Sequence, residues 1–272
     1  MKISTRQCRI GLLAVLLTTA VASLVHAGDA TTIRIPPAAD NTLYERATGD
    51  VSNGAGPSLF IGQTGANANN ALRRALLRFD LSGIPPGSQV VEARLEFSVD
   101  LVPPSPTGFD ARLHRMLSDW GEAGSFAPGA GGGGALAQSG DATWLHRFFD
   151  TDLWTDPGGD FDPAASAVAP VGSATGPVAF ESTPTLVGDV QTWVNQPASN
   201  FGWIMRGEED NPQNARRIPS RENTALAPAL EVTFIPALLP PAATPVPALG
   251  WFGLMLMVLV LGLAAARFAP GR

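Results

Sequence analysis

Arginines are the side chains with the clearest binding chemistry in this chain, and they fall into two groups. Arg74 and Arg78 are an even number of residues apart, so they face the same side if their segment is a β-strand. The second group precedes the last apolar segment of the body. A guanidinium binds a carboxylate through two parallel hydrogen bonds, so both groups could hold the carboxylates of uronate sugars. The predicted binding residues are Arg74, Arg78, Arg216, Arg217 and Arg221.

The competing interpretation is that these arginines pair with acidic residues of the chain itself. Ion pairs of this kind are common on protein surfaces. Asp80 and Glu222 stand close to the two arginine groups in sequence. Paired arginines would hold segments of the fold together rather than a ligand, and the sequence leaves both interpretations open.

Tryptophans are the second candidate, because aromatic faces stack on sugar rings. Trp120, Trp144, Trp154 and Trp203 lie in the part of the chain between its apolar ends. A core position is the competing interpretation for each of them, because large aromatic side chains are mostly buried. Trp154 is predicted to be the surface residue, because it lies in the polar segment 152–160.

A cluster of aspartates around Gly158 and Gly159 is the third candidate. Carboxylate oxygens on a turn suit calcium, although the spacing here differs from that of an EF-hand loop. A solvated acidic loop is the competing interpretation. The predicted calcium ligands are Asp152, Asp156, Asp160 and Asp162.

Catalytic motifs are absent from the sequence. The body has two histidines, His114 and His146, and contains no nucleophile elbow, His-Glu-x-x-His pattern or phosphate-binding loop. We therefore expect a protein that is not an enzyme and has no cofactor other than calcium. Carboxylates are plentiful, so a polysaccharide lyase or hydrolase stays open as an alternative.

The elements that position these residues read mainly as short strands. In residues 90–99, Val91, Ala93, Leu95, Phe97 and Val99 alternate with polar residues, which predicts a half-buried strand. Further strands are predicted at residues 58–62, 74–80, 111–116, 178–180, 201–206 and 230–234.

One segment has helical rather than strand periodicity. Residues 185–194 place Leu186, Val190 and Trp193 at helical spacing, which predicts a short amphipathic helix with Trp193 in the core. Many short strands, one helix and no alternation of strands with helices predict an all-β fold, an antiparallel β-sandwich.

The two ends of the chain carry targeting signals. Residues 1–27 combine a basic start, an apolar stretch and small residues before Gly28, the pattern of a signal peptide. Residues 246–266 form an uncharged apolar run long enough for a transmembrane helix. The sequence therefore predicts a body at residues 28–235, a Pro/Ala-rich spacer at 236–245, a membrane span at 246–266 and a basic cytoplasmic tail at 267–272.

The body is acidic and free of cysteine. Five of the 18 Lys and Arg residues lie in the two end segments, which leaves 13 arginines against 24 acidic residues and a formal body charge of −11. This charge argues against nucleic-acid binding, which needs a basic surface. The single cysteine, Cys8, lies in the signal, so disulfides cannot stabilise the body.

Several stretches in the body resemble the DNRLRE family, whose members look like jelly-roll carbohydrate-binding modules of the CBM96 type. The matching segments follow the family order over most of the body, but Leu145 stands after Trp144 where the family commonly has Asn. The resemblance implies a jelly-roll-like sandwich that binds sugar without catalysis. The matching segments are residues 53–54 with 59–62, 73–85, 93–95, 120–122, 142–144, 154–160, 190–193, 200–204, 220–222 and 228–230.

The C-terminal end resembles bacterial sorting signals of the PEP-CTERM and IPTL-CTERM kind. The match comprises residues 245–250, the apolar run and Arg267, without a Pro-Glu-Pro triplet. It implies contact with export and sorting machinery. We thus expect an exported, membrane-anchored or cell-surface protein that binds polysaccharide, with acidic polysaccharides as candidate ligands. A structural matrix protein without specific glycan binding is the alternative.

Overall fold

The computed structural model describes residues 28–237, 250, 255–256 and 258–259. The predicted signal peptide at 1–27 and basic tail at 267–272 lie outside these residues, as do most of the predicted spacer at 236–245 and span at 246–266. No helix formed by the described residues is long and apolar enough to cross a membrane.

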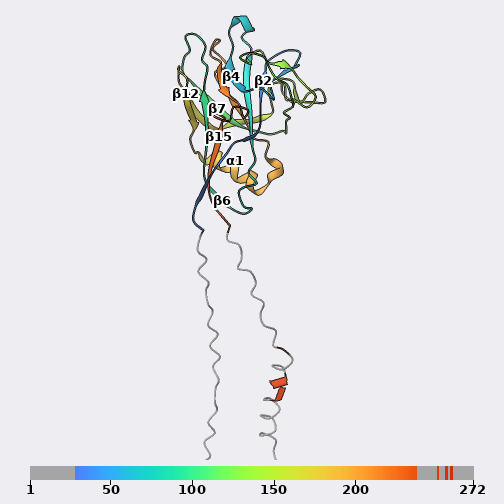
Figure 1. Ribbon diagram of the computed structural model, residues 1–272, viewed down its shortest axis with the longest axis vertical. Helices are drawn as coiled ribbons and strands as arrows, with labels where there is room; N and C mark the ends of the chain where they lie inside the picture. Colours follow the sequence, from blue (N-terminus) through green and yellow to red (C-terminus); the bar gives the residue numbers. More distant parts are fainter. Residues whose placement is uncertain (1–27, 238–249, 251–254, 257, 260–272) are drawn as a thin grey trace, which may run out of the picture.

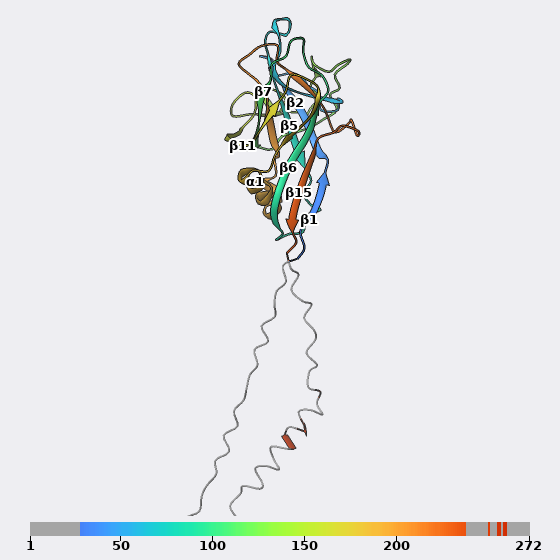
Figure 2. The same ribbon diagram turned by 90° about the vertical axis from the view of Figure 1, so that its left-hand side faces the viewer.

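Two antiparallel sheets make up the body, and residues from both sheets share one hydrophobic core (Figures 1 and 2). This arrangement agrees with the predicted all-β antiparallel sandwich. In spatial order, the smaller sheet contains β1 (Thr31–Ile35), β15 (Ala229–Ile235), β6 (Gln89–Val99) and β12 (Gly176–Phe180). The larger sheet contains β11 (Phe161–Val171), β7 (Phe109–Met116), β13 (Trp203–Arg206), β5 (Leu72–Phe79), β4 (Ser58–Gln63) and β14 (Arg216–Pro219), with β2 (Pro37–Tyr44) paired to β5.

The remaining elements are short and lie between these strands along the chain. Two small sheets pair β9 (His146–Phe148) with β10 (Asp152–Leu153) and β3 (Val51–Ser52) with β8 (Ala135–Leu136). The helical elements within residues 28–237 are α1 (Pro184–Asn195) and the 3-10 turns η1 (Ala66–Ala68) and η2 (Pro197–Ser199).

Strand β6 follows the predicted alternation except at its start. Ala93, Leu95, Phe97 and Val99 are buried, but Val91 is exposed and Val90 is buried instead. The register to β15 shifts between Thr233 and Phe234, which inserts an extra residue on β6. Such a bulge reverses the facing of the residues beyond it, so the prediction of a buried Val91 is wrong.

The central strand β5 is buried on both faces. Ala75, Leu77 and Phe79 enter the main core between the two sheets. Leu76 points to the opposite face and joins a second core. A strand covered on both faces needs apolar residues at successive positions, which explains the unbroken run from Ala75 to Leu77.

The second core lies between the outer face of the larger sheet and a layer of loops. Met116 and Ile204 come from the sheet, whereas Trp144 and Trp154 come from the segment around β9 and β10. The simple sandwich predicted from strand patterns does not include this layer. Because of this layer, aromatic residues that lie in polar loops are buried.

Helix α1 begins and packs as its sequence predicts. Thr183 caps its N-terminus by accepting a hydrogen bond from the Leu186 amide at 3.0 Å, and its hydroxyl also donates to the Ser166 carbonyl at 2.5 Å. On the buried face, the Trp193 ring meets Trp203 of the larger sheet at a centroid distance of 4.4 Å. The helix therefore joins the core through aromatic contact and the sheet through its cap.

The described ends of the body lie together, far from the turn that carries η1. A Cβ at Gly28 would lie 3.7 Å from the carbonyl oxygen of Pro236. In Figure 1 the η1 turn is at the top of the body and both ends leave at the bottom. The η1 turn and the residues that start and end the described body, Gly28 and Pro236, are therefore at opposite ends of the body.

Replacing Thr183 with Ala tests the cap. We expect the free energy of unfolding to fall by about 1–2 kcal/mol, because the helix loses its N-cap acceptor and the link to Ser166. Denaturant unfolding of the variant against wild type measures this difference. Thr185→Ala, at an exposed position in the first turn of the same helix, is the matched control and should not destabilise the protein. Equal stability of both variants would contradict the assigned cap.

Candidate functional site

The guanidinium of Arg74 is bonded to other residues of the fold. Its guanidinium makes a two-fold ion pair with Glu209, with N–O distances of 2.8 and 3.0 Å, and donates to the Gly158 carbonyl at 2.9 Å. Burial alone would raise the pKa of Glu209, but hydrogen bonds from Arg206 and Arg74 outweigh it and hold that pKa below its usual value. Glu209 is therefore a firmly ionised carboxylate between two arginines.

Two further predicted arginines also have single carboxylate partners. Arg78 pairs with Asp119 at 2.6 Å. Arg217 pairs with Asp100 through bonds of 2.9 and 3.1 Å. Within the described residues, the two arginine groups share no partner, so they do not form one cluster.

Arg216 departs from its predicted surface position. It is fully buried, and its guanidinium donates to the carbonyl oxygens of Thr107 at 2.6 Å and Asn214 at 3.0 Å. Burial lowers its pKa. The prediction of Arg216 as a surface binding residue is wrong, because its hydrogen bonds join loops inside the fold.

Trp154 is likewise buried, contrary to the prediction of a surface platform. Only 5% of it is exposed, and its indole nitrogen donates to the Thr143 carbonyl at 2.8 Å. The physical reason is the second core, where the ring packs in the same cluster as Trp144. Trp120, Trp144 and Trp203 are buried as well, so these four rings are core residues.

The predicted calcium ligands do not gather around one point. Asp160 accepts hydrogen bonds from the amides of Thr155 and Asp156, which closes their turn. Asp152 pairs with Arg147, and Asp162 accepts from the Ala164 amide. Among the residues that the structure describes, no group of three or more His, Cys, Asp or Glu side chains is placed to hold a metal ion.

Arg221 lies in a compact group of three carboxylates. It pairs with Glu122 at 2.8 Å and with Glu222 at 3.2 Å, and its amide donates to Oδ2 of Asp40 at 2.7 Å. The other oxygen of Asp40 is buried and has no hydrogen-bond partner in the described part of the chain. Burial, with added repulsion from Glu222 and Glu122, raises the pKa of Asp40 well above its usual value.

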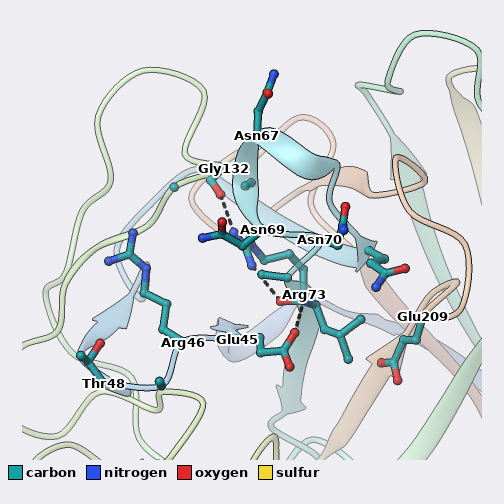
Figure 3. A pocket seen from close by; sticks show the side chains of 15 residues that line it. Glu45, Arg46, Thr48, Asn67, Asn69, Asn70, Arg73, Gly132 and Glu209 are labelled. Carbon is teal, nitrogen blue, oxygen red and sulfur yellow. Dashed lines mark hydrogen bonds between the residues drawn. The ribbon is translucent and has the colours of Figure 1, made fainter.

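The surface feature best suited to a ligand is an open cleft at the η1 end of the body (Figure 3). Its volume is about 950 Å³. Segments from four separate parts of the chain form its walls. Its polar lining consists of Glu45, Arg46, Thr48, Gln63, Asn67, Asn69, Asn70, Arg73 and Glu209, and Gly132 and Gly133 complete it.

The turn between β4 and β5 presents the amide side chains of this cleft. Asn69 and Asn70 adopt left-handed backbone angles, with φ of 59° and 52°. Asparagine tolerates that conformation better than most residues. The Gly65 carbonyl accepts from the amides of Ala68 and Asn70 at 2.9 and 3.1 Å, which fixes the turn. The amides of the cleft are thus held on an ordered framework.

Arg73 forms part of the cleft and has no carboxylate partner among the described residues. It is 6% exposed, donates to the carbonyls of Leu72 at 2.8 Å and Gly132 at 3.3 Å, and lies over the Tyr44 ring. Its Nε is buried without a hydrogen-bond partner in the described part of the chain. Burial lowers the pKa of Arg73, yet an arginine stays protonated at neutral pH.

The cleft is locally positive although the body is acidic. Arg46 is exposed and makes no ion pair with the described residues. Glu209 is already balanced by Arg74 and Arg206, and Glu45 accepts the Leu72 amide at 2.6 Å. Counted with the two arginines that pair with Glu209, four guanidinium groups lie at the cleft against the carboxylates of Glu45 and Glu209, so positive charge exceeds negative charge there.

The sequence interpretation missed this cleft. Two signals marked it: the asparagine-rich run 67–70 and the glycine run 131–134. Tyr44 links the second run to β2 by donating to the Gly131 carbonyl at 2.9 Å.

No protein-family model and no curated protein matches this chain.

Replacing Asp40 with Asn tests the buried carboxylate. The folded state holds the Asp40 proton more tightly than the unfolded state, so its contribution to stability is lost as pH rises above about 4, the unfolded pKa. We expect Asp40→Asn to gain stability relative to wild type as the pH rises above about 4. Unfolding curves across this range measure the difference.

Asp40→Ala separates charge from hydrogen bonding, because it also removes the acceptor of the Arg221 amide. This control should lose stability relative to Asp40→Asn at every pH. If wild type and Asp40→Asn keep a constant difference across the range, the assigned pKa direction is wrong.

Proposed function

We propose that this chain is an exported surface or matrix protein whose jelly-roll-like sandwich binds an acidic polysaccharide without cleaving it. The single observation that carries this proposal is the cleft at the η1 end, which combines ordered amides with a surplus of arginine (Figure 3). The resemblances to DNRLRE modules and to bacterial sorting signals point in the same direction. Anchoring in a membrane through residues 246–266, and passage through export and sorting machinery, are parts of the same proposal.

The chemistry of the cleft suits sugars. Asparagine and glutamine side chains each offer donors and an acceptor, which match the hydroxyl groups of a sugar ring. Gln63, Asn67 and Asn69 supply such groups along one wall. Arg46 supplies a guanidinium that lacks a carboxylate partner among the described residues, and a uronate carboxylate is a partner of suitable charge and shape.

The acidic residues of the cleft support a role without catalysis. Hydrolysis of a glycosidic bond needs one carboxylic acid that donates a proton and a second carboxylate on the other side of the bond. Two arginines keep Glu209 ionised, and its pKa lies below the usual value, so it is a poor proton donor. Glu45 is engaged by the Leu72 amide. Glu209 therefore does not supply the acid of raised pKa that hydrolysis needs.

Affinity electrophoresis of the full-length protein in detergent tests the proposal. Gels contain alginate, pectin or a neutral glucan, with and without calcium. We expect retardation by the uronate polymers and unchanged mobility in the glucan. Unchanged mobility in every gel would reject glycan binding and favour the structural matrix alternative. Release of shortened products would favour a lyase or hydrolase, and retardation that requires calcium would support the predicted calcium site.

Arg46→Ala is the variant that tests the cleft. A hydrogen-bonded ion pair contributes about 1.5–3 kcal/mol, so we expect the affinity for uronate polymers to fall about tenfold or more. Added salt should weaken wild-type binding in the same direction, because exposed charges are screened. Arg34→Ala is the matched control, since it removes an exposed arginine from β1 of the other sheet. Equal affinities of Arg46→Ala and wild type would place the site elsewhere.

A further inference from the structure

We infer that the binding site continues from the cleft across Arg74 into a second hollow, so that it takes an internal stretch of several acidic sugars rather than one sugar or a chain end. This inference rests on the proposed function, because it concerns the same ligand and the same surface. It goes beyond that function by stating the length and the path of the bound chain.

The second hollow lies against the loop after β10 and has a volume of about 410 Å³. Arg74 forms one of its walls, and Leu117, Asp156 and Phe161 contribute others. Leu117 is 52% exposed, although it is a large apolar residue beside a polar loop. Apolar side chains of this kind pack against the C–H face of a sugar ring, while polar groups orient it.

One ion pair separates the two spaces. Glu209 lines the cleft and Arg74 lines the second hollow, and their side chains are 2.8 and 3.0 Å apart at the two bonds. Arg74 also donates to the Gly158 carbonyl in the loop of the second hollow, at 2.9 Å. A lining residue of each space therefore takes part in the same ion pair, which places the two spaces side by side.

The strip between the two spaces carries a net positive charge. Arg206 pairs with the same Glu209, and its guanidinium lies over the Phe161 ring at 5.3 Å. Two guanidinium groups therefore share one carboxylate on this strip. A polymer with a carboxylate on successive sugars would meet attraction at Arg46 and on this strip, which a neutral polymer would not. Asp156 and Asp160 line the second hollow with negative charge, so contact there depends more on Leu117 and Phe161.

A path of this kind predicts how affinity depends on chain length. Once a chain occupies the cleft, its contact with the second hollow is intramolecular and adds affinity without a second association cost. The affinity should rise from short to longer oligouronates and then level off once both spaces are filled.

Titration of the full-length protein in detergent with oligouronates from disaccharide to octasaccharide tests this. In wild type we expect the longest chains to bind at least about tenfold more tightly than the disaccharide, a factor worth about 1.4 kcal/mol. Leu117→Ser should weaken the binding of long chains about fivefold and leave the disaccharide unchanged. Asp156→Asn removes a negative charge from the second hollow and should strengthen the binding of long chains only. Leu226→Ser, at a leucine of 48% exposure that lines a groove beside the smaller sheet, is the matched control and should change nothing.

The outcomes separate the inference from the proposed function. Equal affinities for short and long chains, or long-chain affinities that neither Leu117→Ser nor Asp156→Asn changes, would overturn the extended path while binding in the cleft stands. No binding of any oligouronate would reject the proposed function as well. Unfolding curves of both variants should match that of wild type, and this control separates a loss of binding from misfolding.

Discussion

Burial of β5 on both faces is the constraint on which the rest of the molecule depends. One face of the strand enters the core between the sheets, and the other carries Arg74, Leu76 and Arg78. Leu76 must be covered, so a layer of loops with three tryptophans packs over it. That layer also encloses the two arginines, each of which lies over a tryptophan ring. A loop of this layer also lines the second hollow, so the shape of that hollow depends on the same requirement of the core.

Enclosed arginines in turn explain much of the acidic composition. A partly buried guanidinium that keeps its charge needs a carboxylate or carbonyl oxygens close by. Arg74, Arg78 and Arg217 form ion pairs with carboxylates, whereas Arg216 donates hydrogen bonds to backbone carbonyl oxygens. Carboxylates that surround an arginine also repel each other, as Asp40, Glu122 and Glu222 do around Arg221. In the cleft, Arg46 and Arg73 have no carboxylate partners in the described part of the chain.

Local patterns predicted seven strands and the helix, because alternation and helical spacing act between near neighbours in sequence. They missed β1, β2, β11 and β14 of the two main sheets. The exposure of Val91 escaped prediction, because a bulge depends on the register to a partner strand. Trp154 escaped for a related reason: its surroundings are polar along the chain but apolar in space. Segments near residues 46, 67, 132 and 209 form the cleft together. No pattern within one of these segments predicts that they lie side by side in the fold. The ion-pair alternative for the arginines named Glu222 and Asp80 because they are close in sequence. The structure pairs Arg221 with Glu222 as named, but pairs Arg78 with Asp119 and not with Asp80.

The position of β15 has a mechanical consequence. This strand lies between β1 and β6, hydrogen-bonded to both, and runs toward the end of the body at which the chain leaves (Figure 2). A pulling force between the η1 end and the C-terminal end of β15 would act along the strand and load its hydrogen bonds together in shear. Peeling, which breaks such bonds one at a time, would require a force across the strand. Resistance to a steady pull is governed by the rate of unfolding, so this geometry favours a body that stays folded under tension along its long axis.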